Sequence, residues 1–182
     1  GHAIAAALAR QGATVTLVSG PVTIDPPPGV KLVSVDTAQQ MYDACMAALP
    51  ADIAVCAAAV ADWRAQSPKD HKMKKQIADK MSLDLVKNPD ILAALGHHQQ
   101  RPNLLIGFAA ETDDVIANAT AKRQRKGCDW IVANDVSPET GIMGGSENAV
   151  TLITDAGAED WPRLSKSETA ERLAQKIAEA LQ

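Results

Sequence analysis

Apolar and polar positions along the chain follow two different periods, which predicts that strands and helices take turns. Short, almost continuously apolar runs indicate buried strands, and the clearest is 52–58, which we expect to be buried on both faces. Segments in which apolar residues recur at helical spacing indicate helices. The predicted strands are 14–18, 31–35, 52–58, 82–86, 103–109, 129–133 and 149–153, and the predicted helices are 3–11, 37–49, 112–127, 165–181 and one that starts at 88. This alternation favours a doubly wound α/β fold, with a mostly parallel sheet and helices on both faces.

Residues at the element boundaries support this assignment. Thr37 is a suitable cap for the second helix, and Ser165 with Glu168 forms the sequence of a capping box before the last one. Asn88 followed by Pro89 predicts a helix that Asn88 caps and Pro89 opens. Strand 82–86 alternates between polar and apolar residues, which indicates a half-exposed or edge strand.

The chain opens on Gly1 and passes directly into a helix. A doubly wound domain normally begins with a strand, a glycine loop and then a helix. We therefore expect one domain over residues 1–182 that lacks its first strand. A domain that simply starts with a helix is the alternative.

Composition narrows the class of protein. The chain has only three Trp, one Tyr and one Phe, so aliphatic residues must build the core. A net charge of −4 argues against general nucleic-acid binding, which needs a broad basic face. Three cysteines without Cys-x-x-Cys spacing indicate reduced thiols and a cytoplasmic protein. No apolar run approaches the roughly 20 residues that span a bilayer, so no membrane partner is expected.

One polar segment carries a net positive charge, in contrast to the chain as a whole. Residues 64–87 contain seven Lys or Arg against three Asp, a local charge of +4, directly after the apolar run 53–61. A cationic loop at a strand end suggests a site for a compact polyanion such as a nucleoside triphosphate. The alternative is a solvated loop that merely collects lysines.

Four junctions between a predicted strand and the segment after it carry polar residues: 56–62, 88–91, 107–112 and 134–137. In an open α/β sheet these junctions gather along one edge, where ligands bind. Lys122 and Lys126 lie one helical turn apart and share a face. That pair could bind an anion, or it could be a solvated helix end that complements the helix dipole.

Other signals are missing from the sequence. The four histidines have no metal-ligand spacing, and neither a phosphate-binding P-loop nor a nucleophile elbow occurs. No acidic residue follows the strand 14–18, where a dehydrogenase would hold the ribose. A nucleotide-binding domain without catalysis and an NAD(P)-dependent reductase on a similar sheet remain alternatives to a nucleotide-using enzyme.

Several segments are informative when taken together: 12–21, 58–63, 72–75, 88–92, 107–112 and 133–137, extended by the glycine-rich 141–148. In this order they resemble the phosphopantothenate–cysteine ligase domain of bacterial coenzyme A synthesis. The resemblance covers nearly the whole chain and implies a Rossmann-like fold. It also implies a homodimer that uses CTP and Mg²⁺ to turn the carboxylate of 4′-phosphopantothenate into an acyl-cytidylate. The amine of L-cysteine then attacks this anhydride.

The resemblance also implies roles for individual residues. Lys72 is the catalytic lysine of a flexible loop near the phosphates, and the ligands of Mg²⁺ are not implied. The implied nucleotide-binding residues are Cys56, Ala57, Ala58, Asp62, Lys72, Asn88, Pro89, Asp90, Ile91, Phe108, Lys122 and Lys126. Family members carry an upstream strand and an Asn-containing loop, and often an upstream decarboxylase domain, to which FMN would belong. We expect that asparagine to be absent here and the fragment alone to lack full activity.

Overall fold

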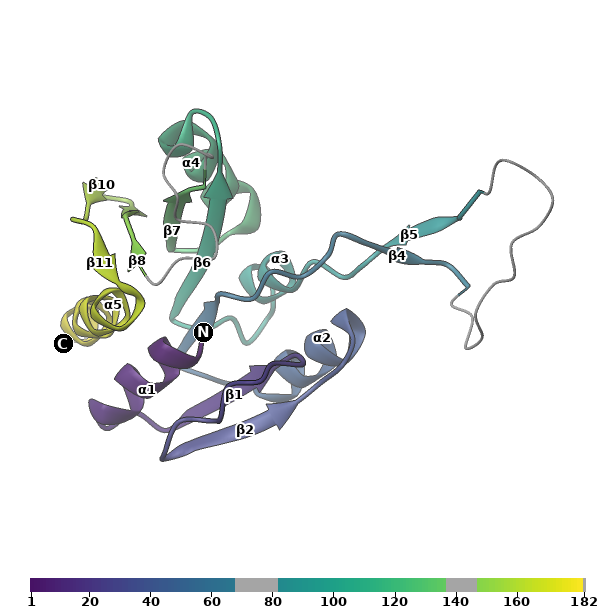
Figure 1. Cartoon of the computed structure of the whole chain (residues 1–182), viewed down its shortest axis with the longest axis horizontal. Coiled ribbons are helices and arrows are strands. Elements are labelled where there is room, and N and C mark those ends of the chain that lie inside the picture. Colours follow the sequence, from purple (N-terminus) through teal and green to yellow (C-terminus); the bar gives the residue numbers. More distant parts are fainter. Residues whose placement is uncertain (68–81, 137–146, 182) are drawn as a thin grey trace.

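The computed structural model of the chain describes residues 1–67, 82–136 and 147–181 (Figure 1). Its centre is a five-stranded sheet in the order β10-β9-β7-β6-β3. The strands are β3 (Ile53–Cys56), β6 (Leu104–Glu111), β7 (Trp130–Asp135), β9 (Val150–Thr154) and β10 (Gly157–Asp160). β3, β6 and β7 are parallel, whereas β9 and β10 run antiparallel to their neighbours. The expected mixed α/β fold with a mostly parallel central sheet is confirmed.

Helices cover both faces of this sheet. They are α1 (His2–Arg10), α2 (Ala38–Ala47), α3 (Ile91–Gly96), α4 (Val115–Lys126) and α5 (Lys166–Ala180). Alternate residues of β6 separate the two faces. Leu104 and Ile106 join the core cluster with α1 and α5, while Leu105 and Ala109 join the cluster with α2, α3 and α4. The molecule is thus three layers deep, with the sheet in the middle.

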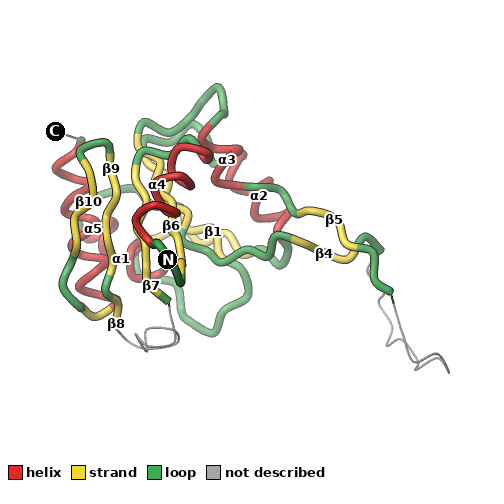
Figure 2. The backbone as a smooth tube through the Cα atoms, turned by 90° about the horizontal axis from the view of Figure 1, so that it is seen from above, coloured by secondary structure: helices red, strands yellow, loops and turns green. Residues whose placement is uncertain are grey.

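The remaining strands form small sheets of their own. β1 (Val15–Ser19) pairs in parallel with β2 (Val30–Ser34), and β8 (Glu147–Asn148) pairs with β11 (Leu164–Ser165). β4 (Trp63–Ala65) and β5 (Leu85–Lys87) form an antiparallel pair. This pair, here called the arm, projects away from the body of the molecule in both views (Figures 1 and 2).

Several predicted boundaries are confirmed by their hydrogen bonds. Thr37 caps α2 in a capping box with Gln40, and Ser165 caps α5 in a capping box with Glu168. The backbone N–H of Glu168 donates to Oγ of Ser165 at 3.1 Å, and the N–H of Ser165 donates to the Glu168 carboxylate at 2.9 Å. α4 ends at Lys126 as predicted, with Gly127 in the left-handed conformation that glycine adopts without strain.

Three expectations about elements were wrong. Asn88 does not cap α3; Asp90 does, so the helix begins at Ile91 and Pro89 lies outside it. β3 is half-buried rather than buried on both faces, because it forms an edge of the five-stranded sheet. Residues 63–65, expected in a loop, form β4, and β10 was not predicted.

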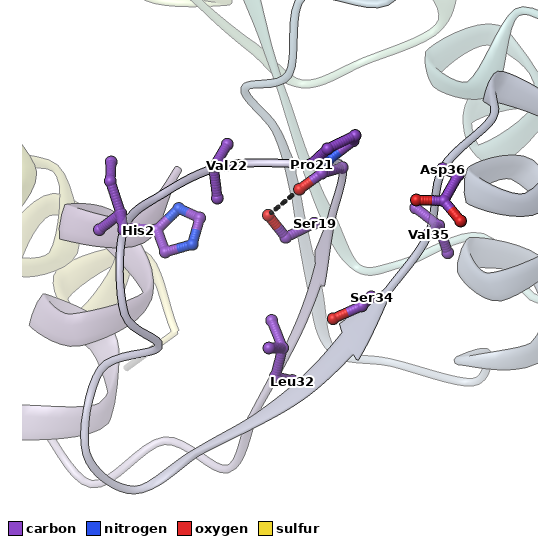
Figure 3. Close-up of a pocket in the computed structure, with 10 residues that line it drawn as sticks. His2, Ser19, Pro21, Val22, Leu32, Ser34, Val35 and Asp36 are labelled. Carbon is purple, nitrogen blue, oxygen red and sulfur yellow. Dashed lines mark hydrogen bonds between the residues drawn. The ribbon is translucent and has the colours of Figure 1, made fainter.

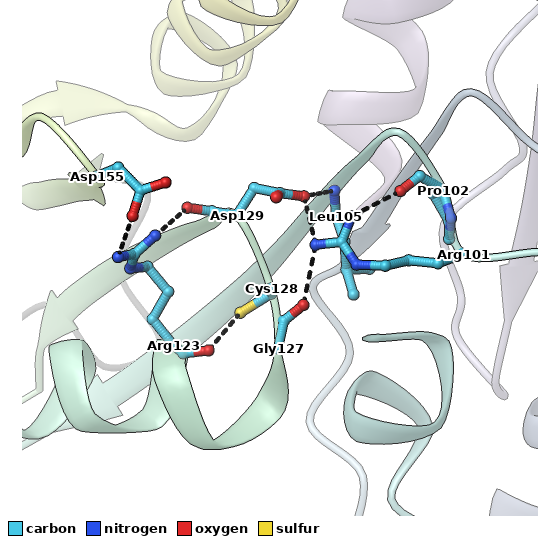
Figure 4. A network of polar contacts seen from close by, with 8 residues as sticks. All are labelled: Arg101, Pro102, Leu105, Arg123, Gly127, Cys128, Asp129 and Asp155. Carbon is cyan, nitrogen blue, oxygen red and sulfur yellow. Dashed lines mark hydrogen bonds and ion pairs between the residues drawn. The ribbon is translucent and has the colours of Figure 1, made fainter. Parts of the chain in front are cut away.

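A polar network fixes the amino ends of β6 and β7 to the end of α4 (Figure 4). Asp129 accepts a 2.7 Å hydrogen bond from the backbone N–H of Leu105 and pairs with Arg101 at 2.9 Å. Arg101 also donates to the carbonyls of Pro102 and Gly127, each at 2.9 Å. The helix that carries Lys122 and Lys126 is therefore tied to the sheet at its carboxyl end.

Candidate functional site

The candidate site begins where β3 ends. Cys56 lies beside Gly107 of β6 in the parallel ladder, and Ala57 and Ala58 follow it out of the sheet. Burial raises the pKa of the Cys56 thiol to about 12, with smaller contributions from Cys45, Cys128 and Asp90. The thiol therefore stays neutral near pH 7 and is a poor nucleophile. Residues 56–58 can therefore contact a ligand through their surface and through their backbone N–H and C=O groups.

The base of the arm passes next to this strand end, and Asn88 joins its two sides. Its backbone N–H donates to the carbonyl of Asp62 at 2.8 Å, and its Nδ2 donates to the carbonyl of Ala61, also at 2.8 Å. Its Oδ1 accepts a 3.2 Å hydrogen bond from Arg64, whose guanidinium also donates to the carbonyl of Lys87. The Asn88 side chain therefore holds the arm's base, while the Asp62 side chain beside it is exposed.

Asp90 connects this region to α4. Its carboxylate accepts a 3.1 Å hydrogen bond from the backbone N–H of Ala93, which caps α3, and forms an ion pair with Lys126. Burial alone would raise the pKa of Asp90. The hydrogen bonds from Lys126 and Ala93 outweigh burial and hold that pKa below its ordinary value. The carboxylate is therefore ionised at neutral pH.

Close packing holds α3 on the sheet. A Cβ on residue 107 would lie 2.6 Å from Cδ2 of Leu92 and 2.8 Å from Cδ1 of Ile131. Glycine at this position lets the Leu92 and Ile131 side chains pack directly against the backbone of β6. Ile91, the first helical residue, is buried in the core cluster shared with α4. Pro89, between Asn88 and the helix, is half-buried.

Most of the predicted nucleotide residues therefore come together at one edge. Hydrogen bonds, an ion pair, electrostatic interaction or proximity in the chain link residues 56–58, Asp62, the segment 88–91 and Lys126. Lys122 lies one turn before Lys126 on α4. Phe108 is different, because its side chain packs against the core cluster on the α1 and α5 side. Lys72 lies outside the described residues.

A small cavity occurs elsewhere, at the carboxyl ends of β1 and β2 (Figure 3). Its volume is about 130 Å³, and its lining includes His2, Ser19 and Asp36. Ligand pockets commonly measure roughly 300–1,000 Å³, so this cavity is too small for a nucleotide. It also shares no lining residue with the edge formed by Cys56, Asp90 and Lys126.

Two negative findings apply to the described parts of the chain. Residues 1–67, 82–136 and 147–181 contain no group of three His, Cys, Asp or Glu side chains arranged to hold a metal ion. Within the same ranges, no helix combines the length and apolar character needed to cross a membrane.

Similarity to known proteins shows the family of this chain. The family model of the DNA/pantothenate metabolism flavoprotein C-terminal domain matches residues 1–181. The chain belongs to this family. The coenzyme A biosynthesis bifunctional protein CoaBC of Vibrio vulnificus strain YJ016 is 42% identical over 179 residues, which cover 97% of this chain and 45% of that protein. CoaBC of Escherichia coli K12 is 45% identical over 165 residues, 89% of this chain and 41% of that protein.

Solved structures agree on the fold of this family member. The crystal structure of the C-terminal domain of CoaBC superposes with a TM-score of 0.81 at 35% identity, covering 100% of this chain and 81% of that one. A Cab2 mutant in complex with phosphopantothenate-cysteine has a TM-score of 0.57 at 17% identity, covering 84% of this chain and 53% of that one, which shows the fold alone. The chain spans less than half of the CoaBC proteins that it matches.

Two features of this site are not evident from the sequence. Arg64, in sequence only one cation of a positively charged loop, is fixed on β4 and hydrogen-bonded to Asn88. Asp90, in sequence only one of several expected nucleotide contacts, is paired with Lys126. Neither contact leaves a local signal, because the partners lie 24 and 36 residues apart in the chain.

Proposed function

We propose that this chain is the ligase domain that joins 4′-phosphopantothenate to L-cysteine in coenzyme A biosynthesis, in the cytoplasm. CTP drives the reaction, and the products are 4′-phospho-N-pantothenoylcysteine, CMP and pyrophosphate. The observation that carries the proposal is the gathering of residues 56–58, Asp62, Asn88, Asp90 and Lys126 at one sheet edge. The similarity to CoaBC proteins along the whole chain supports the choice of substrates.

The chemistry that such a site must support occurs in two steps. The carboxylate of phosphopantothenate attacks the α-phosphorus of CTP, a new C–O–P link forms, and pyrophosphate leaves with the electron pair of the broken P–O bond. The cysteine amine then attacks the acyl carbon and displaces CMP, and the amine loses a proton. Negative charge builds up on phosphoryl oxygens in the first step, so fixed cations stabilise its transition state.

Each group of residues has a role in this proposal. Lys126 and Lys122 face the triphosphate from α4, and Lys72 supplies a further positive point charge. Backbone groups of residues 56–58 read the cytosine edge, since a site built to hydrogen-bond an exocyclic group rejects analogues that lack it. The neutral thiol of Cys56 supports a contact role rather than covalent catalysis.

Mg²⁺ would enter with the nucleotide. This ion usually keeps several waters and takes phosphate oxygens together with one or two carboxylates. Asp62 is exposed at the same edge and could supply a carboxylate ligand. When bound, the ion neutralises charge on the triphosphate.

A homodimer is part of the proposal, and the arm supports it. Trp63 is 51% exposed, Leu83 59% and Leu85 51%, and all three lie on or beside the two projecting strands. Large apolar side chains gathered on a projecting element are typical of a protein interface. We also propose that an upstream strand completes the sheet between β1 and β3. Both of these strands are sheet edges within the described residues.

The test is a turnover assay on the intact protein. Pyrophosphate release should require CTP and 4′-phosphopantothenate, and CMP release should further require cysteine. A nucleotide-binding domain without catalysis would bind CTP and release nothing. A reductase would instead oxidise NADPH with a suitable substrate, and either result would overturn the proposal.

A further inference from the structure

The backbone of Lys126 is held in place by its neighbours. Gly96, the last residue of α3, packs so closely that a Cβ on residue 96 would overlap the Lys126 carbonyl oxygen. The next residue, Gly127, ends α4 with φ 64°, and its carbonyl accepts a 2.9 Å hydrogen bond from Arg101. The Cα atom of Lys126 is therefore held in a fixed position relative to α3.

Asp90 fixes the other end of that side chain. The Lys126 side chain extends from the carboxyl end of α3 to the N-cap of that helix, where its ammonium pairs with the Asp90 carboxylate. The same carboxylate caps α3 through the backbone N–H of Ala93, at 3.1 Å. This hydrogen bond holds the carboxylate at the start of the helix. The Asp90 carboxylate therefore stays in place if the Lys126 side chain moves.

The pair lies at the edge where the other site residues meet. Asp90 is two residues from Asn88, which is bonded to Asp62, and its charge is close enough to Cys56 to affect that thiol. The Lys126 side chain is 20% exposed, so its ammonium is partly shielded yet still reachable from solvent. An anionic ligand bound at this edge would contact the Lys126 ammonium.

We propose that Asp90 is a positioning residue, whose carboxylate holds the Lys126 ammonium so that its remaining N–H donors meet the nucleotide phosphates. This inference rests on the proposed function, since it takes the edge to be a triphosphate site. A lysine that is already held loses less conformational freedom when the ligand binds. Asp90 acts through Lys126, because its own negative charge would repel a phosphate placed directly against it.

The experiment measures KM for CTP, KM for cysteine and kcat in the intact enzyme, with pyrophosphate release as readout. The variants are Asp90→Asn, Lys126→Gln and the double variant. Asparagine is also a good cap, so Asp90→Asn should keep α3 folded and lower the melting temperature only slightly. We expect KM for CTP to rise about tenfold, the effect of one charge-assisted hydrogen bond, with KM for cysteine unchanged. In the Lys126→Gln background the same change should add little, because the two residues act as one unit.

A matched control is Glu171→Gln, which removes a carboxylate paired with Arg10 between α1 and α5 on the opposite face of the sheet. That variant should leave both KM values as in the wild type. The inference is overturned if Asp90→Asn leaves KM for CTP unchanged, or raises it equally with and without Lys126. A wild-type enzyme without CTP-dependent turnover would instead overturn the proposed function, and this inference with it.

Discussion

Gly96 lies against the backbone carbonyl of Lys126 with no room for a methyl group. Since the obstacle is backbone rather than a movable side-chain end, Gly96→Ala must push α3 and α4 apart. We expect a loss of about 1–3 kcal/mol in the free energy of unfolding, as for other overpacked sites. Chemical denaturation measures it directly.

Two other glycines serve as comparisons for that variant. At Gly107, the atoms in the way are the ends of the Leu92 and Ile131 side chains, so Gly107→Ala should cost less. At Gly20, the nearest atoms lie 4.0 Å from an added Cβ, so Gly20→Ala should leave the stability almost unchanged. Equal losses at all three positions would contradict the packing argument.

Asn88 should control the local stability of the arm. Asn88→Ala removes the hydrogen bonds to Ala61 and from Arg64 but keeps the backbone bond to Asp62. We expect faster amide hydrogen exchange in β4 and β5, with a loss of about 0.5–1.5 kcal/mol per bond. Gln39→Ala, which removes an exposed bond to Asp43 on α2, is the control and should leave the arm unchanged. Unaltered exchange in the Asn88 variant would show that the side chain does not hold the arm.

The Asp90 ion pair predicts a pH dependence of stability. The pKa of Asp90 in the folded protein lies below its ordinary value of 3.8, so the charged form favours folding. This stabilisation is complete above that ordinary value and is lost as the pH falls through the folded pKa. The melting temperature of the wild type should therefore exceed that of Asp90→Asn by a constant amount at neutral pH, and the gap should close in acid. A gap that persists or widens there would contradict the assignment.

Lys72 lies outside the described residues, and its role rests on the sequence alone. If it stabilises charge on the phosphates, Lys72→Gln in the intact protein should slow pyrophosphate release at least about a hundredfold. Lys31→Gln, on β2, is a control of the same charge change and should leave the rate unaltered. A Lys72 variant as fast as the wild type would remove this residue from the mechanism.

Local sequence patterns predicted most of the fold for physical reasons that the structure makes clear. Apolar runs, helical spacing and the caps at Thr37 and Ser165 all depend on residues within one or two turns of each other. The strand expected over 82–86 overlaps β5, but β4 and β10 escaped prediction because strands of three or four residues show no usable period. β3 is half-exposed because it lies at the edge of the sheet. Which strands lie at an edge depends on strand pairing, and the local sequence pattern does not show it.

The site could be predicted as a set of strand ends, but not as a set of contacts. Asn88 and Asp90 are both good caps, and Pro89 between them favoured the wrong one. Asp90 also has a partner in Lys126, 36 residues away, that the local sequence cannot show. Cys56 and Asp62 follow the parallel strand β3, so their place at the sheet edge agrees with the topology that the sequence predicts. The segment 88–91 reaches the same edge for another reason, because the antiparallel arm returns the chain beside Asp62.

Amide hydrogen exchange with and without CTP tests the central claim most directly, namely that this edge holds the nucleotide. Saturating CTP should slow exchange at residues 56–62, 88–92 and the last turn of α4, and it should do so more than ATP or NADPH at the same concentration. Protection confined to the cavity at Ser19 and Asp36, or an equal effect of NADPH, would contradict the account.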